Sequence, residues 1–222
     1  MSVDPVVDAE RRPVIVAIDG PAGAGKSTVG RAVAARLGLQ YLDTGAMYRA
    51  VTFAALRRGI DPGDADDVAA VSEAVELELD GSSVMVDGVD ATVEIRGREV
   101  TAAVSAVAAN SRVRSELVRR QRSWVAEHGG GVVEGRDIGT VVFPDATLKL
   151  YVTASPRVRA ERRVADIGGD VAEVEASIIE RDRKDSTRAD SPLTEGSDAI
   201  VVDTTDMSIE DVVHRVLGLM PA

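Results

Sequence analysis

The feature that most constrains this chain is a glycine-rich segment near its start, Gly20-Pro-Ala-Gly-Ala-Gly-Lys26-Ser27-Thr28. It fits the pattern G-x-x-x-x-G-K-[ST], in which a curled backbone points its N–H groups at phosphate oxygens. A short apolar run at 14–18 precedes the segment and a helical pattern follows it. We therefore predict a strand, a phosphate-binding loop and a helix in that order.

The loop has the side chains that a polyphosphate requires. Lys26 can reach the outer phosphates, and the hydroxyl of Ser27 can bind Mg²⁺. The alternative is a glycine-rich turn with an exposed lysine, which the strand and helix around the motif disfavour. The residues expected to bind the phosphates are Gly20, Gly23, Ala24, Gly25, Lys26, Ser27 and Thr28.

Composition limits the class of protein. A chain of 222 residues makes one domain, or one domain with insertions. Only 3% of the residues are aromatic, so the core must be aliphatic, and the chain has 0 Cys, which excludes disulfides and thiolate chemistry. We expect residues 1–12 to form a loose tail, no segment to span a membrane, and the protein to be cytoplasmic.

The charge distribution argues against a nucleic-acid or membrane partner. The net charge is −11, whereas such partners attract a broad excess of Lys and Arg. Yet thirteen arginines lie between positions 112 and 188, in a chain with only three lysines. The guanidinium fork suits phosphate, although at least half of these arginines should simply cover solvated helix faces.

Five short apolar runs, separated mostly by helical patterns, predict an α/β fold with a five-stranded parallel sheet. They lie at 14–18, 40–42, 132–134, 147–153 and 199–202. Between 75 and 98 the apolar residues alternate instead, up to Val93 and Ile95, which predicts a small antiparallel insertion or a surface hairpin without function. A helical stretch at 101–127 must break near Asn110 if Ser105 and Arg114 are to face one ligand.

Several charged residues follow predicted strands, where open α/β sheets bind ligands. Arg49 lies six residues past the second strand, although a solvated arginine is equally compatible with this position. Arg136 and Asp137 follow the third strand, and Arg159 and Arg163 share a helix face after the fourth. A dense charged run, from Arg181 to Arg188, comes later.

Four blocks of sequence together resemble the bacterial cytidylate kinase family. They are Gly20-Pro-x-Gly-x-Gly-Lys26-Ser27-Thr28, Asp43-Thr-Gly-Ala-Met-Tyr-Arg49, Glu134-Gly-Arg-Asp137-Ile-Gly-Thr-Val-Val-Phe-Pro-Asp and Arg181-Asp-x-x-Asp185-x-x-Arg188. The resemblance runs from about Val14 to Gly218. It implies a three-layer P-loop fold over 13–222, with a monophosphate-binding insertion at about 43–128 and a short lid at about 156–170.

The resemblance also implies a reaction and a set of site residues. ATP with Mg²⁺ would lie on the phosphate loop, CMP and dCMP would be the acceptors, and we expect a monomer. Lys26, Arg159 and Arg163 would be the catalytic residues. The positions that match the family's CMP contacts are Arg49, Arg136 and Arg188 for the phosphate, Arg181 and Asp185 for the ribose, Ser105, Arg114 and Asp137 for cytosine, and Thr44.

Two positions depart from the family pattern, and two other functions are compatible with part of the motif set. Thr44 stands where the family often has serine, and Glu134 where it has aspartate, so the hydroxyl and the carboxylate are kept. A P-loop kinase of another small metabolite would share the loop and lid. A regulatory GTPase would need an Asn-Lys-x-Asp string, which the sequence lacks.

Overall fold

A computed structural model describes residues 13–81 and 83–221 of the chain. The expected loose tail at 1–12 lies outside the described residues. Within them, no helix is long and apolar enough to cross a membrane.

The centre of the molecule is a five-stranded parallel sheet, as the sequence predicts. Its strands are β1 (Val14–Asp19), β2 (Tyr41–Asp43), β6 (Gly130–Glu134), β7 (Leu148–Thr153) and β8 (Ile200–Asp203), in the spatial order β2-β6-β1-β7-β8. β1 lies between β6 and β7, pairing Val16 with Val132 on one side and with Leu148 on the other. The phosphate loop therefore leaves the middle of the sheet, where ligands bind in such folds.

Helices cover both faces of this sheet and produce two apolar cores. α1 (Lys26–Leu37) and α8 (Ile209–Gly218) pack on one face through Val33 and Val213. On the other face α2 (Thr44–Arg57) and α5 (Ser111–His128) bury small and branched aliphatic side chains. This three-layer arrangement explains why so few aromatic residues suffice for the core.

The insertion between β2 and β6 contains α2, α3 (Ala65–Ala74), β3 (Leu77–Asp80), β4 (Ser83–Val86), β5 (Val89–Asp90), α4 (Arg98–Ala109) and α5. The antiparallel sheet β3-β4-β5 confirms the predicted change of pattern. The predicted extension of strand structure to Val93 and Ile95 is wrong. The N–H of Ile95 donates to the carbonyl of Ala91 and a short 3-10 turn, Glu94–Arg96, follows, which buries Ile95 and leaves Val93 exposed.

The predicted break in the long helical stretch is confirmed at Asn110, which separates α4 from α5. Its side chain accepts hydrogen bonds from the N–H groups of Arg112 and Val113 at 3.0 and 3.3 Å, so it caps α5. The break lets residues on two differently directed helices face the same space.

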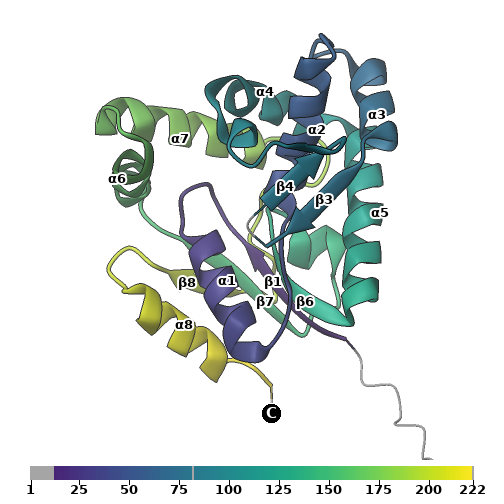
Figure 1. The fold of residues 1–222 in the computed structure, drawn as a ribbon. Coiled ribbons are helices and arrows are strands. Elements are labelled where there is room, and N and C mark those ends of the chain that lie inside the picture. The colour runs from purple at the N-terminus through teal and green to yellow at the C-terminus, as the bar shows by residue number, and fades with distance from the viewer. Residues whose placement is uncertain (1–12, 82, 222) are drawn as a thin grey trace, which may run out of the picture.

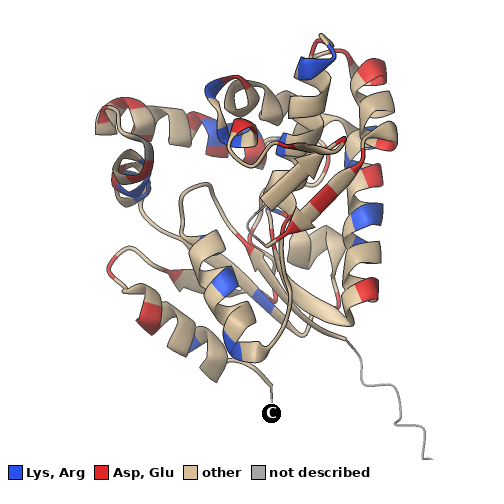
Figure 2. Cartoon of the chain, in the orientation of Figure 1, with Lys and Arg blue, Asp and Glu red and all other residues tan. Residues whose placement is uncertain are grey.

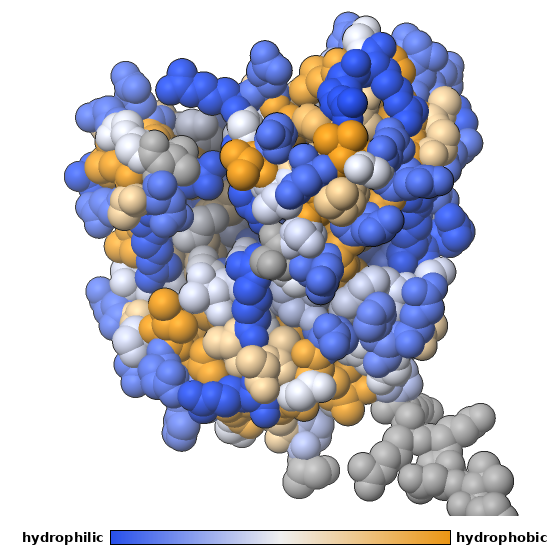
Figure 3. All heavy atoms as spheres, in the orientation of Figure 1, coloured by the Kyte–Doolittle hydropathy of each residue, from blue (hydrophilic) through white to orange (hydrophobic). Residues whose placement is uncertain are grey.

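After β7 the chain forms two helices that pack against each other, α6 (Pro156–Ile167) and α7 (Val171–Ser186). They lie opposite the insertion, and the surface is hollowed where the two parts face each other (Figures 1 and 3). Both helices carry basic and acidic residues (Figure 2).

Candidate active site

The phosphate loop adopts a backbone that only glycine takes readily. Gly20, Gly23 and Gly25 have φ of 142°, 76° and 87°. A Cβ on Gly20 would lie 1.9 Å from the carbonyl oxygen of Val152, so the loop packs directly on β7. Gly25 ends the loop and α1 begins at Lys26, which places the positive end of that helix at the loop.

Lys26 lies under the loop with only 6% of its surface exposed. Its Nζ donates to the carbonyl oxygen of Pro21 at 2.8 Å. Burial, together with the positive charge of Arg136, lowers the pKa of Lys26 to about 7. A phosphate anion beside Nζ would reverse this effect, since an opposite charge favours the ammonium form.

Ser27 faces a buried carboxylate rather than solvent. Its Oγ donates to Oε1 of Glu134 at 2.8 Å. Oε2 of Glu134 is buried without a hydrogen-bond partner in the described chain. Burial raises the pKa of Glu134, and Asp43, its partner in the β2–β6 register, raises it further. The hydroxyl and the free carboxylate oxygen thus converge beside the phosphate loop, which is a donor set of the kind that Mg²⁺ prefers.

Four arginines from distant segments form what we call the arginine cluster: Arg49, Arg136, Arg163 and Arg181. Burial lowers the pKa of Arg49 to about 10, and the charges of Arg181 and Arg163 add to the effect. The pKa of Arg181 also falls to about 10, through burial and then the charge of Arg136. Cations that repel one another in a partly dry place form a receptor for a multiply charged anion.

The cluster has some protein partners, which fix it without neutralising it. Arg49 donates to the carbonyl oxygen of Ile95 and to Oγ1 of Thr101, both at 2.9 Å. Arg136 pairs with Asp185, with Nε 3.0 Å from Oδ2. Nε of Arg181 is buried with no hydrogen-bond partner among the described residues.

A second group, further along the same space, combines a cation with a carboxylate. Arg114 donates to Oδ2 of Asp137, and both side chains are almost fully buried, at 3% and 5% exposed. The Arg114 guanidinium also lies over the ring of Tyr48, 5.8 Å from its centroid. Burial lowers the pKa of Arg188, and the charge of nearby Arg114 lowers it further.

Of two further residues predicted to contact the substrate, Thr44 makes a hydrogen bond within the protein and Ser105 lies on α4. Oγ1 of Thr44 donates to the carbonyl oxygen of Glu134 at 2.7 Å, which ties α2 to β6. Ser105 lies half-buried on α4, the helix whose Ala108 carbonyl accepts a hydrogen bond from Arg114 at 3.4 Å.

The two predicted lid arginines differ in their surroundings. Arg159 is 4% exposed and donates to the carbonyl oxygen of Ala22, in the phosphate loop, at 3.0 Å and to Oδ2 of Asp182, in α7, at 2.6 Å. Arg163 instead joins the arginine cluster. Both positions follow because α6 carries the two arginines from the phosphate loop toward the arginine cluster.

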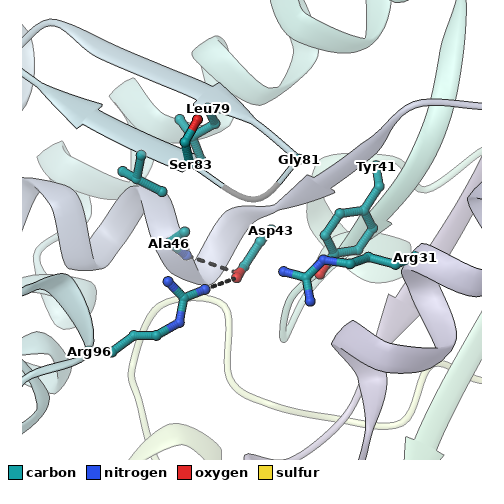
Figure 4. Close-up of a pocket in the computed structure, with 9 residues that line it drawn as sticks. Arg31, Tyr41, Asp43, Ala46, Leu79, Gly81, Ser83 and Arg96 are labelled. Atoms are coloured by element: carbon teal, nitrogen blue, oxygen red, sulfur yellow. Dashed lines mark hydrogen bonds and ion pairs between the residues drawn. The ribbon is translucent and has the colours of Figure 1, made fainter. Parts of the chain in front are cut away.

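Sequence reasoning missed several residues of this region. Arg162 donates to the hydroxyl and carbonyl oxygens of Thr204 at 3.0 and 2.7 Å, beside the phosphate loop. Figure 4 shows Arg31, from α1, and Arg96, from the insertion, on opposite sides of Asp43. Arg96 lies 3.6 Å from Asp43 and so links the insertion to the core. The only sequence signal for Arg162 was the run of arginines after the fourth predicted strand, and Arg31 and Arg96 gave none.

A phosphate loop at the centre of a parallel sheet, facing buried arginines, defines a P-loop kinase. Comparison with known proteins gives the family. The family model described as cytidylate kinase matches residues 16–222, and this chain belongs to that family. It is 50% identical over 216 residues to the cytidylate kinase of Mycobacterium avium (strain 104), covering 93% of this chain and 95% of that protein.

A second relative agrees with this result. The cytidylate kinase of Corynebacterium efficiens is 50% identical over 218 residues, which cover 94% of this chain and 95% of the relative. Among solved structures, a gluconokinase from Sinorhizobium meliloti 1021 aligns with a TM-score of 0.50 at 16% identity, covering 94% of this chain and 92% of that one. At this identity the likeness concerns the fold alone.

Proposed function

We propose that this protein transfers the γ-phosphoryl group of ATP to the 5′-phosphate of CMP, giving ADP and CDP, and that dCMP is also an acceptor. The observation that carries the proposal is the buried Arg114–Asp137 pair beside the arginine cluster, in a chain of the cytidylate kinase family. A cluster of cations suits a phosphate, and a buried pair of donor and acceptor suits the polar edge of a base.

The chemistry needs no covalent intermediate, because an oxygen of the acceptor phosphate attacks the γ-phosphorus in line with the leaving ADP oxygen. The chain's task is to bring two anionic groups together and to neutralise them. We assign Lys26 to the donor phosphates, Arg49, Arg136 and Arg188 to the acceptor phosphate, and Arg181 and Asp185 to the ribose. We assign Arg163, from the arginine cluster, to the transferred group.

Mg²⁺ would bind at Ser27 and Glu134. The unpartnered Oε2 of Glu134, next to the Ser27 hydroxyl, supports the fit. When bound, the ion supplies positive charge to the phosphate oxygens of the donor. Glu134 and Ser27 orient it, and the raised pKa of Glu134 is expected to fall when a cation replaces the missing partner.

Base selectivity would come from Asp137 and Arg114. The Asp137 carboxylate can accept a hydrogen bond from the exocyclic amino group of cytosine, and Arg114 can donate to O2 or N3. Uracil has an oxygen in place of the amino group and a hydrogen on N3, so the contact with Asp137 and a contact of Arg114 with N3 become repulsive, whereas a contact with O2 is the same for both bases. Buried polar groups that stay unpaired reject a ligand strongly, and we expect a CMP preference of about 100-fold.

The test is ADP release over a panel of CMP, dCMP, UMP, AMP and small hydroxylated metabolites. We expect CMP to give the highest kcat/KM, and Asp137→Ala to narrow the CMP/UMP ratio mainly by lowering kcat/KM for CMP. Asp66→Ala, an exposed aspartate paired with Arg112, is the control. Use of UMP within about threefold of CMP would refute the cytosine assignment, and a better non-nucleotide acceptor would refute the function.

A further inference from the structure

Asp19 is a buried carboxylate that the proposed chemistry does not use. It is the last residue of β1, directly before Gly20 of the phosphate loop, and is 6% exposed. Its side chain reaches across the sheet to the segment that follows β6. Oδ1 accepts a hydrogen bond from the N–H of Ile138 and Oδ2 one from the N–H of Gly139, both at 2.8 Å.

These two N–H groups open the π-helical turn Ile138–Val142, which begins immediately after Asp137. The same segment is held to β1 once more, by a hydrogen bond of 2.9 Å from the N–H of Gly135 to the carbonyl oxygen of Ile18. Two consecutive residues of β1 thus hold the backbone on either side of Asp137, Ile18 through its main-chain carbonyl and Asp19 through its side chain. The direction of the Asp137 side chain depends on both.

The packing around this joint leaves little freedom for adjustment. A Cβ on Gly139 would lie 3.2 Å from the side chain of Lys149 and 3.4 Å from Oδ2 of Asp19. A Cβ on Gly135 would lie 2.7 Å from the side chain of Ile138. Without the two hydrogen bonds to the Asp19 carboxylate, this closely packed turn has little space in which to form replacement contacts.

The ionised form of Asp19 is costly here, which argues for a specific role. Burial raises the pKa of Asp19 to about 6, with a smaller contribution from the charge of Asp137, while the two N–H groups and the charge of Lys26 oppose the rise. Only a carboxylate presents two acceptor oxygens to two neighbouring N–H groups, since the amide of asparagine has one acceptor and would turn a donor toward the other.

We propose that Asp19 is a positioning residue for base recognition: its carboxylate fixes the backbone that aims Asp137 and thereby sets the discrimination between cytosine and uracil. The inference rests on the proposed function, because it concerns how the site reads its acceptor. It also joins the two substrate sites physically, since the residue that holds the base-reading segment is the one that starts the phosphate loop.

The test compares Asp19→Asn with Asp64→Asn. Asp64 is the matched control because its side chain also accepts two backbone N–H groups, at the start of α3 and exposed to solvent. We expect Asp19→Asn to lower the CMP/UMP ratio of kcat/KM by about fivefold to tenfold, the effect of one lost hydrogen bond, through a loss in CMP use. The KM for ATP should stay within about twofold, and Asp64→Asn should leave the ratio unchanged.

The outcomes separate the possible roles. Equal losses for CMP and UMP would mean that Asp19 serves stability alone, and a raised KM for ATP with an unchanged ratio would mean that it acts through Lys26; either overturns the inference. If Asp19→Asn does not fold, amide hydrogen exchange in the wild-type enzyme decides between the outcomes. The inference requires the N–H groups of Ile138 and Gly139 to be protected as well as those of β6, and rapid exchange of these two groups would refute it. Wild-type enzyme that fails to use CMP would refute the proposed function instead.

Discussion

Replacing Arg181 by methionine should stabilise the free protein while impairing it as an enzyme. Arg181 is half-buried in the arginine cluster, its buried Nε has no hydrogen-bond partner among the described residues, and the charges of Arg136 and Arg163 oppose its own. Asp185 and Asp182 offset only part of this repulsion. Methionine fills similar space with a flexible apolar side chain and removes the buried charge.

The lowered pKa sets the scale of the effect. Burial and the charge of Arg136 lower the pKa of Arg181 to about 10, well below its ordinary value. At about 1.4 kcal/mol per pKa unit this corresponds to at most about 3 kcal/mol of unfavourable free energy for the charged form in the fold. We expect Arg181→Met to raise the free energy of unfolding by about 1 to 3 kcal/mol. The gain is partly offset because Asp182 and Asp185 lose a neighbouring positive charge. The folded pKa lies far above neutrality, so the gain should not vary between about pH 6 and pH 8.

Urea unfolding at constant protein concentration measures the stability, and calorimetric titration with CMP measures binding. CMP affinity should fall at least about tenfold, and CMP should protect the wild type against urea more than the variant. The control is Arg183→Met on the same helix, where the arginine is exposed and pairs with Glu180. A loss of more than about 1 kcal/mol in Arg181→Met would show that Arg181 is a structural ion-pair partner of its aspartates, and would refute the reasoning.

Three further predictions concern Lys26 and the α6 arginines. Lys26→Ala should keep a normal circular dichroism spectrum and melting temperature but lose about 100-fold or more in kcat, and activity within about tenfold of wild type would contradict this. Because the pKa of Lys26 is lowered to about 7, ATP binding at pH 8 should take up a proton, seen as an enthalpy that depends on the buffer and is absent in Lys26→Met. The unfolded lysine binds its proton more tightly than the folded one, so the free energy of unfolding should also rise above pH 7 by up to about 1.4 kcal/mol per pH unit, a rise that Lys26→Met lacks. Arg159→Ala should destabilise the protein by about 2 kcal/mol or more by leaving Asp182 unpaired, whereas Arg163→Ala should lower kcat with little effect on stability; equal effects of the two changes would contradict the assignment.

The sequence predicts those parts of this fold that are encoded locally. The phosphate loop needs glycines at fixed places, and the buried strands need continuous apolar runs, so both can be identified from a few neighbouring residues. The break at Asn110 was predictable because Ser105 and Arg114 could not otherwise face the same way. The alternation of apolar residues up to Ile95 led to a wrong prediction of strand structure there. β5 has only two residues, and the chain turns before Val93 can pair with a neighbouring strand.

The sequence did not predict the contacts between distant segments. Asp19 lies 119 residues from Ile138, and nothing in the apolar run before it indicates that its side chain crosses to β6. Arg159 and Arg163 share a helix face, but one reaches the phosphate loop and the other the cluster, because α6 spans the distance between them. α3 was not predicted, since its buried side chains are small and give a weak periodic signal.

The contacts of Arg159 have a consequence for how the two nucleotides affect each other. The guanidinium of Arg159 donates hydrogen bonds to the carbonyl oxygen of Ala22, in the phosphate loop, and to the carboxylate of Asp182, the neighbour of Arg181 in α7. We therefore expect a shift of the phosphate loop on ATP binding to be transmitted to α7, and the two nucleotides to bind with positive coupling. Thermodynamic linkage requires the coupling to be reciprocal: the factor by which a non-hydrolysable ATP analogue tightens CMP is the factor by which CMP tightens the analogue. Arg159→Met, which removes both hydrogen bonds, should bring that single factor close to one in both titrations.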